Sequence, residues 1–253
     1  MYILKTKETK DTFFVLIKND YICSNMKIVF FTGSGLSAES GLLTFRDSGG
    51  YWDKYSVEDV ATVDGWHKNR ELVLEFYNQY RRLVQSAKPN AAHVGISKFI
   101  KENPDYKVSV ITQNVDDLLE RAGVENVYHM HGSILEAKST NKGFTYPIGY
   151  DDITLGQKGE DGSQLRPNVV FFGELVHYLE ECAELVKTCD VLCIIGTSLN
   201  VYPASDMITM AQPRCRIYIL DPNADELKLD NTHINICKTA TEGIEELIEE
   251  IKN

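Results

Sequence analysis

The chain has 253 residues, of which 43% are hydrophobic and 25% charged, ordinary values for a globular protein that argue against a disordered chain. Its 26 basic and 37 acidic residues give a formal net charge of −11, which disfavours binding to duplex nucleic acid and would suit a positively charged protein substrate. The length allows one large domain or two modest ones.

The sequence indicates neither a membrane protein nor a secreted one. No apolar run approaches the roughly 18 residues of a membrane-spanning helix, and the apolar stretch at 13–17 is flanked by charge, which makes a poor signal peptide. Six cysteines without a CxxC pair predict free, mostly buried thiols rather than a disulfide framework. We expect a cytoplasmic protein with no membrane or nucleic-acid partner; nothing in the sequence indicates an oligomeric state. The cysteines are Cys23, Cys182, Cys189, Cys193, Cys215 and Cys237.

Residues 1–26 are predicted to be an N-terminal extension, with one domain at 27–253. Charged residues mix in the extension with short apolar pieces. Met26 directly precedes a clean strand pattern, so translation could begin there; a genuine N-terminal hairpin or tail is the alternative.

From Lys27 onward, short β-rich runs alternate with helical stretches. The run at 191–195 is continuously apolar, as in a strand buried on both faces of a parallel sheet. This alternation predicts an α/β fold with a Rossmann-like, doubly wound parallel sheet. Strands are predicted at 27–32, 107–112, 168–172, 191–196 and 216–220, and helices at 70–87, from the cap residue Asn90 to 100, and at 240–251.

One segment interrupts the alternation. Glycines recur between Ser139 and Arg166, where aliphatic residues are few. Long segments of this kind in compact domains are often functional. We expect an ordered small insert at roughly 133–167, with a disordered crossing as the alternative.

A glycine-rich turn follows the first predicted strand. In Gly33-Ser-Gly-Leu-Ser-Ala-Glu-Ser-Gly41, the residues Gly33, Gly35 and Ala38 fit the G-x-G-x-x-A pattern that lets backbone amides approach a pyrophosphate. A dehydrogenase would carry an acid about 20 residues on, at the end of a strand. Asp53 has that distance but lies in no strand pattern. The turn therefore predicts phosphate binding, but not ordinary hydride transfer.

Polar residues follow the strand predicted at 107–112, in Thr112-Gln-Asn-Val-Asp116. The carboxyl ends of parallel strands are where such sheets hold ligands, and these amides and the carboxylate suit a ribose. A plain helix cap by Asn114 or Asp116 is the alternative.

Two histidines lie in the run Val127-Tyr-His-Met-His-Gly132, read as a short strand that puts both rings on one face. A histidine with a pKa near neutral is a natural general base. Zinc binding by His129 and His131 lacks a partner at a convincing spacing. The other four are read as structural or surface residues: His67, His93, His177 and His233.

These motifs together resemble the sirtuins. The resemblance rests on residues 33–46, 112–116, 131–132, 169–174 and 196–203, which occur in the sirtuin order, and spans about 27–247. Sirtuins are NAD-dependent protein-lysine deacylases whose Rossmann-like domain and small domain hold NAD and an acylated lysine between them. The resemblance makes residues 27–253 a sirtuin-like catalytic domain.

The resemblance implies a catalytic set with His131 as the general base, and with Asn114 and Asp116. Binding of the NAD cofactor would fall to Gly33, Ser34, Gly35, Ala38, Glu39, Thr44, Phe45, Arg46, Tyr51, Trp52, Gln113, Asn114, Val115, Asp116, His131, Gly196, Thr197, Ser198, Asn223 and Ala240. The acylated protein or peptide substrate would contact Ala61, Tyr77, Arg81, Val170, Phe172, Gly173, Glu174, Leu199 and Val201.

The reaction implied is attack of the acyl oxygen on the ribose carbon as nicotinamide leaves, giving free lysine and O-acyl-ADP-ribose. His131 would deprotonate a ribose hydroxyl. The alternatives on the same fold are a protein ADP-ribosyltransferase or an NAD hydrolase; a non-catalytic NAD-binding module is a further one.

The chain departs from the family in its small domain. Sirtuins usually carry a four-cysteine zinc module after the catalytic histidine, but no cysteine lies between His131 and Gly173. We therefore predict no zinc and no metal site. Packing would hold the insert instead, around Phe144, Tyr146, Tyr150 and Leu165.

The acyl preference is the second departure. Ala61 resembles the small residue of deacylases that favour succinyl and malonyl groups, and Tyr77 matches their tyrosine. Those deacylases carry an arginine three positions after the tyrosine, but that position is Tyr80 here. The nearest arginine is Arg81, one residue later, and on a helix this shift turns its side chain by roughly 100°. Arg81 and the following arginine could also be solvated charges. We expect a deacetylase or broad deacylase rather than a strict desuccinylase.

Overall fold

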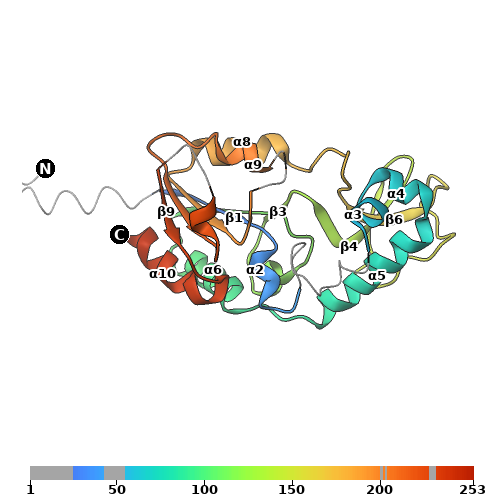
Figure 1. The fold of residues 1–253 in the computed structure, drawn as a ribbon, viewed down its shortest axis with the longest axis horizontal. Helices are drawn as coiled ribbons and strands as arrows, with labels where there is room; N and C mark the ends of the chain where they lie inside the picture. The colour runs from blue at the N-terminus through green and yellow to red at the C-terminus, as the bar shows by residue number, and fades with distance from the viewer. Residues whose placement is uncertain (1–24, 43–54, 200–201, 203, 228–231) are drawn as a thin grey trace, which may run out of the picture.

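The computed structural model describes residues 25–42, 55–199, 202, 204–227 and 232–253 (Figure 1). Its larger sheet has six parallel strands in the order β3-β2-β1-β7-β8-β9. These strands are β1 (Lys27–Thr32), β2 (Lys107–Thr112), β3 (Val127–His129), β7 (Val191–Ile195), β8 (Arg216–Leu220) and β9 (His233–Ile236).

Helices cover both faces of this sheet (Figure 1). On one face, α6 (Ala91–Glu102) and α10 (Ala240–Lys252) pack on alternate strand residues such as Phe30 and Cys193. On the other, α8 (Leu179–Thr188) and α9 (Ala204–Ile208) pack on the intervening strand residues. The Rossmann-like, doubly wound α/β fold is therefore confirmed.

Local sequence signals set the ends of the long helices. The side chain of Asn90 accepts hydrogen bonds from the amides of Ala92 and His93 and begins α6, and Thr239 caps α10 with Glu242 in a capping box. Helix α5 (Arg70–Ser86) begins after Asn69, whose side chain accepts from the Leu72 amide. All three predicted helices are present within two residues of their predicted ends.

A second, antiparallel sheet lies beside the first, in the order β5-β4-β6. It contains β4 (Gly132–Ser139), β5 (Thr145–Pro147) and β6 (Leu165–Val169), so the ordered insert is confirmed. Helix α5 packs against it with α3 (Val57–Val60) and α4 (Val63–Lys68) around a separate apolar cluster that includes Trp66, Phe76 and Phe171. Residues 55–87 were not predicted to be part of the insert, but they pack with it in one small unit (Figure 1).

The strand predicted at 168–172 is wrong. Strand β6 spans Leu165–Val169, and it pairs with β4 rather than with the parallel sheet. Past Val169 the chain pairs elsewhere: the Phe172 amide donates to the Ala61 carbonyl at 2.8 Å. The predicted strand began too late because Arg166 did not look like part of a buried strand, although it is buried. Strand β9 was not predicted at all.

Polar contacts hold the turns of the insert together. One Asp161 carboxylate oxygen accepts from the Lys142 amide at 3.0 Å and the other from the Ser163 amide at 2.9 Å. The backbone hydrogen bond from Ser163 leads the contacts that lower the pKa of Asp161 to about 2. Of the four residues predicted to pack here, Tyr146, Tyr150 and Leu165 contact the apolar cluster, but Phe144 is 44% exposed. Among the described residues, no helix is both long and apolar enough to span a membrane.

Candidate active site

Two glycine turns meet where the strand order reverses, between β1 and β7, the position at which sheets of this kind bind ligands. The Gly35 amide donates to the Gly196 carbonyl at 2.9 Å. A Cβ on Gly35 would lie 2.6 Å from the Gly196 Cα, and Gly196 itself has φ +60. Only glycine permits this approach, so the predicted Gly33, Gly35 and Gly196 form one continuous turn surface.

Side chains join the ends of three neighbouring strands. The Thr197 hydroxyl, after β7, donates to Gln113 Oε1, after β2, at 2.7 Å. The Gln113 amide donates to the carbonyl of Thr32 in β1 at 2.9 Å. The predicted polar cluster at 112–116 and the predicted turn at 196–198 therefore lie together.

Ser37 connects the amide and the carboxylate of this cluster. Its hydroxyl donates to Asp116 Oδ2 at 3.0 Å and accepts from Asn114 Nδ2 at 3.2 Å, while His93 Nε2 lies 3.4 Å away. Asp116 is 5% exposed, and burial raises the pKa of its carboxyl. Burial lowers the pKa of His93 to about 4, so this ring is neutral.

Sequence reasoning missed this role of Ser37 and read His93 as structural or surface. The role of Ser37 could have been predicted, because its hydroxyl lies in the glycine-rich turn at 33–41. The contact of His93 could not have been predicted, because its partner, Ser37, is 56 positions away in the sequence.

The two neighbouring histidines differ in protonation. His129 Nδ1 lies 2.8 Å from the Asn114 carbonyl and Nε2 lies 2.7 Å from the Glu120 carboxylate, so both nitrogens face acceptors and both must carry protons. Burial alone would lower the pKa of His129, but the hydrogen bond and charge of Glu120 outweigh it and raise that pKa. Both contacts therefore favour the imidazolium form of His129.

Within the described part of the chain, His131 has one such acceptor. Its Nδ1 donates to the Gln113 carbonyl at 2.9 Å, and burial lowers the pKa of the ring. The neutral ring then has its proton on Nδ1 and a lone pair on Nε2. Strand β3 ends at His129, so the short strand predicted to hold both histidines is wrong; instead, the two rings bind consecutive carbonyls of the 113–114 segment.

The predicted peptide-binding segment is anchored between the two sheets. The Val170 amide donates to the His131 carbonyl at 2.9 Å, and Phe172 forms a parallel bridge with Thr62 next to Ala61. The Phe172 side chain is 54% exposed. Gly173 beside it has φ +96, and Leu199 after β7 has φ +54.

Glu174 lies at the end of the same segment but faces inward. Its carboxylate accepts from the Phe171 amide at 2.9 Å and from Lys138 Nζ at 3.4 Å, and it pairs with Arg166. Burial opposes ionisation of Glu174, but these bonds, led by Arg166, lower its pKa overall.

Of the three residues predicted for the acyl group, Tyr77 and Arg81 lie on one buried stretch of α5, whereas Ala61 follows α3. Tyr77 stacks on Phe171 with ring centroids 5.9 Å apart, and Tyr80 lies within electrostatic reach of Asp116. Burial raises the pKa of both phenols. Arg81 is fully buried rather than solvated, whereas Arg82 is exposed and pairs with Asp152 at 2.8 Å.

The Arg81 guanidinium donates hydrogen bonds within the small unit. Its Nε donates to the Ile134 carbonyl at 2.9 Å and its Nη1 to Asn78 Oδ1 at 2.8 Å. Burial lowers its pKa to about 10, and the nearest opposing charges are Asp152 and Asp151 of the insert.

The remaining predicted cofactor residues lie around the same strand ends. The Glu39 carboxylate accepts from the Thr241 amide at 3.0 Å and from Thr239 Oγ1 at 3.1 Å, which places it against the start of α10 at Ala240. Asn223 follows β8, with its amide on Asp221 Oδ1 at 2.9 Å. Six predicted site residues lie outside the described residues: Thr44, Phe45, Arg46, Tyr51, Trp52 and Val201.

Comparison with known proteins identifies the family. The family model described as "Sir2 family" matches residues 33–203, more than half of the chain. The chain belongs to the Sir2 family. The predicted resemblance to sirtuins is thereby confirmed.

Relatives and solved structures agree with this assignment. The chain is 42% identical over 221 residues to an NAD-dependent protein deacylase of Helicobacter pylori strain J99, covering 87% of this chain and 93% of that protein. It is 40% identical over 227 residues to one of Bacteroides thetaiotaomicron, covering 87% and 95%. A Sir2 homologue in complex with NAD superposes with a TM-score of 0.79 at 33% identity, covering 89% of each chain.

The site of this Sir2 protein fits NAD by its own chemistry. The glycine turns leave no side chain between the backbone of 33–35 and that of 196, and amide and carboxylate groups of Gln113, Asn114 and Asp116 stand beside them. Among the described residues, no three His, Cys, Asp or Glu side chains come together as a metal site.

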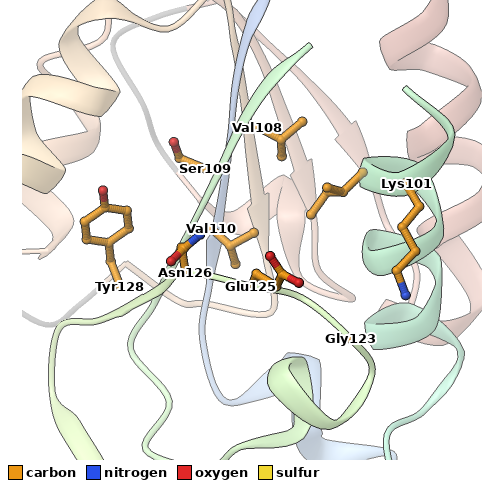
Figure 2. Close-up of a pocket in the computed structure, with 9 residues that line it drawn as sticks. Lys101, Val108, Ser109, Val110, Gly123, Glu125, Asn126 and Tyr128 are labelled. Atoms are coloured by element: carbon orange, nitrogen blue, oxygen red, sulfur yellow. The ribbon is translucent and has the colours of Figure 1, made fainter. Parts of the chain in front are cut away.

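A separate cavity of about 540 Å³ lies elsewhere on the larger sheet. It is lined by residues of α6, the first half of β2 and the segment from Gly123 to Tyr128 (Figure 2). No predicted site residue lines it.

Proposed function

We propose that this chain removes neutral acyl groups, such as acetyl, from lysine side chains of proteins, consuming NAD and releasing nicotinamide and O-acyl-ADP-ribose. NAD-dependent protein deacylation is the activity of the curated relatives at about 40% identity, and it is the activity of this chain. The observation that carries the proposal is the His131 ring beside the strand ends that hold Asn114 and Asp116, with Nδ1 bound to Gln113 and Nε2 without a partner among the described residues.

His131 would act as the general base. Its Nδ1–H is held by the Gln113 carbonyl, so the ring keeps one orientation while Nε2 accepts a proton from a ribose hydroxyl. Bound NAD supplies the bond between nicotinamide and ribose that is broken. Ser37 would hold Asn114 and Asp116 in place beneath that ribose.

The preference for neutral acyl groups rests on the charges around Tyr77 and Tyr80. Both phenols stay neutral at physiological pH because burial raises their pKa values. The guanidinium of Arg81 is bound to Ile134 and Asn78 and faces the acids of the insert. Among the described residues, only Nη2 of this guanidinium lacks a partner, so Arg81 would offer an acyl carboxylate one nitrogen rather than a bidentate pair, and the desolvation of that carboxylate would be poorly compensated.

We also propose that the insert at about 133–167 needs no zinc, and that residues 1–26 are an extension of the catalytic domain. The absence of cysteine between His131 and Gly173 supports the first point, as do the bonds of Asp161. Metal analysis of the purified protein tests it, and stoichiometric zinc would contradict it. A cytoplasmic location is supported by the free thiols.

Product analysis tests the function. The purified chain is incubated with NAD and matched peptides bearing acetyl-lysine or succinyl-lysine, and the products are identified by mass spectrometry. We expect O-acetyl-ADP-ribose, with at least about tenfold lower turnover of the succinyl peptide. ADP-ribosylated peptide or free ADP-ribose as the main product would instead assign a transferase or a hydrolase.

A further inference from the structure

Two buried cysteines, far apart in the sequence, lie side by side at the start of neighbouring strands. Cys189 follows α8 and stands two residues before β7, and Cys215 directly precedes β8. Their Sγ atoms are 3.5 Å apart. Strand pairing brings them together, since the Arg216 amide donates to the Asp190 carbonyl at 2.9 Å. The sheet itself therefore fixes this contact.

The two thiols have different surroundings. Cys189 is 1% exposed, and its single S–H can donate either to the Val186 carbonyl at 3.1 Å or to Cys215 Sγ at 3.5 Å, both of which favour its protonated form. Cys215 is 7% exposed. A hydrogen bond from Cys189 leads the contacts that lower the pKa of Cys215, with the Leu192 amide and the Arg216 charge, although burial and the Asp190 charge oppose this. Cys215 is thus the sulfur that ionises more readily and lies nearer to solvent.

We propose that Cys189 and Cys215 are a thiol–disulfide site that hydrogen peroxide oxidises to an intramolecular bond. The Cys215 thiolate attacks a peroxide oxygen, and hydroxide leaves and takes up the proton that Cys215 had lost. The Cys189 sulfur then attacks the resulting sulfenic sulfur, and its proton leaves with the sulfenic hydroxyl as water. The two thiols lose two electrons, and the peroxide is reduced to two waters.

The bond would close a loop that contains β7, the Gly196 turn and α9. Closing such a loop restricts the unfolded chain and so stabilises the folded one. The sulfurs lie at the amino ends of β7 and β8, whereas Gly196 follows the carboxyl end of β7. Oxidation would therefore strengthen the larger sheet without rebuilding the predicted NAD site.

The test uses the full chain carrying Cys23→Ser and Cys237→Ser, because Cys237 is exposed and Cys23 lies outside the described residues. The folded protein is treated with hydrogen peroxide, digested without reduction and analysed by mass spectrometry. We expect a linked Cys189–Cys215 peptide and a Tm higher by roughly 5–10 °C, both reversed by dithiothreitol. Cys215→Ser or Cys189→Ser should abolish both results.

Cys193→Ser is the matched control, because Cys193 is fully buried within β7 and should not be needed. A link from Cys193 to Cys215 would overturn the proposal. The absence of any linked Cys189–Cys215 peptide would also overturn it when the unsubstituted protein, treated with the same peroxide, is oxidised at Cys237. The comparison of the oxidised with the reduced unsubstituted protein does not depend on the folding of any variant.

Discussion

The six-stranded sheet buries apolar residues on both faces, whereas the three-stranded sheet and its helices bury charged and amide side chains. In β7, every residue from Val191 to Ile195 is buried and apolar. In β6, the buried residues include Arg166 and Asn168, and in α5 they include Arg81. Burial of an apolar side chain stabilises a sheet without a specific partner. A buried charged side chain does so only when the group that pairs with it is in place. The small unit should thus be the part more sensitive to single polar substitutions.

Arg81→Met tests this difference with the largest expected effect. Loss of the guanidinium removes the Arg81 hydrogen bond to the Ile134 carbonyl and leaves Asn78 Oδ1 with the Ile153 amide as its donor, so we expect the free energy of unfolding to fall by about 2–4 kcal/mol. Arg82→Met is the matched control, because Arg82 is exposed and its pair with Asp152 should contribute less than about 1 kcal/mol. Urea unfolding of both variants measures the difference; equal losses would refute a special role for Arg81.

The pair of His129 and Glu120 gives a smaller, pH-dependent effect. The pKa of His129 is raised in the folded protein, so its contribution is fully present below the unfolded value of about 6.5 and is lost as pH rises through the folded pKa. Because Glu120 is 39% exposed, Glu120→Gln should cost only about 1 kcal/mol at pH 6, and nothing at a pH where His129 is neutral.

Glu125→Gln serves as the control for that experiment, since Glu125 is an exposed acid on the same segment. Thermal unfolding at several pH values provides the measurement. A loss in Glu120→Gln that does not depend on pH would rule out the imidazolium.

Asp161→Asn should have the smallest effect, confined to the insert. Weaker acceptance from Lys142 and Ser163 should speed hydrogen exchange of those two amides while the amides of β7 keep their rates. The pKa of Asp161 is depressed to about 2, so its contribution is present above the unfolded value of about 3.9 and is lost as pH falls through 2. Faster exchange throughout β7 would show that the two regions are not independent.

The same contrast explains what could be predicted from the sequence. Continuous apolar runs identified β1, β7 and β8, and polar residues at strand ends identified Gln113 and Asn114. Strand β9 was missed because its four residues, His233–Ile236, alternate polar and apolar without a strong run. Strand β6 was misplaced because burial of its charge depends on Glu174, which lies on a different segment.

The site shows the same limit. His131 and Asp116 were predicted from sequence motifs, and the structure places both beside the 113–116 segment. Contacts that join distant segments carry no local signal, as between Ser37 and His93 or between Cys189 and Cys215. Placing Arg81 required the structure, because its buried partners lie on β4 as well as on its own helix.

The central claim is that His131, which lies at the junction of the two regions and whose Nε2 has no partner among the residues the structure describes, is the base of an NAD-dependent protein deacylase. The most direct measurement compares His131→Ala with His67→Ala, an exposed histidine elsewhere, for NAD binding by calorimetry and for O-acetyl-ADP-ribose formation. We expect His131→Ala to bind NAD like the unsubstituted protein but to form product at least about 100-fold more slowly, while His67→Ala is unchanged. Full product formation by folded, NAD-binding His131→Ala would contradict the account.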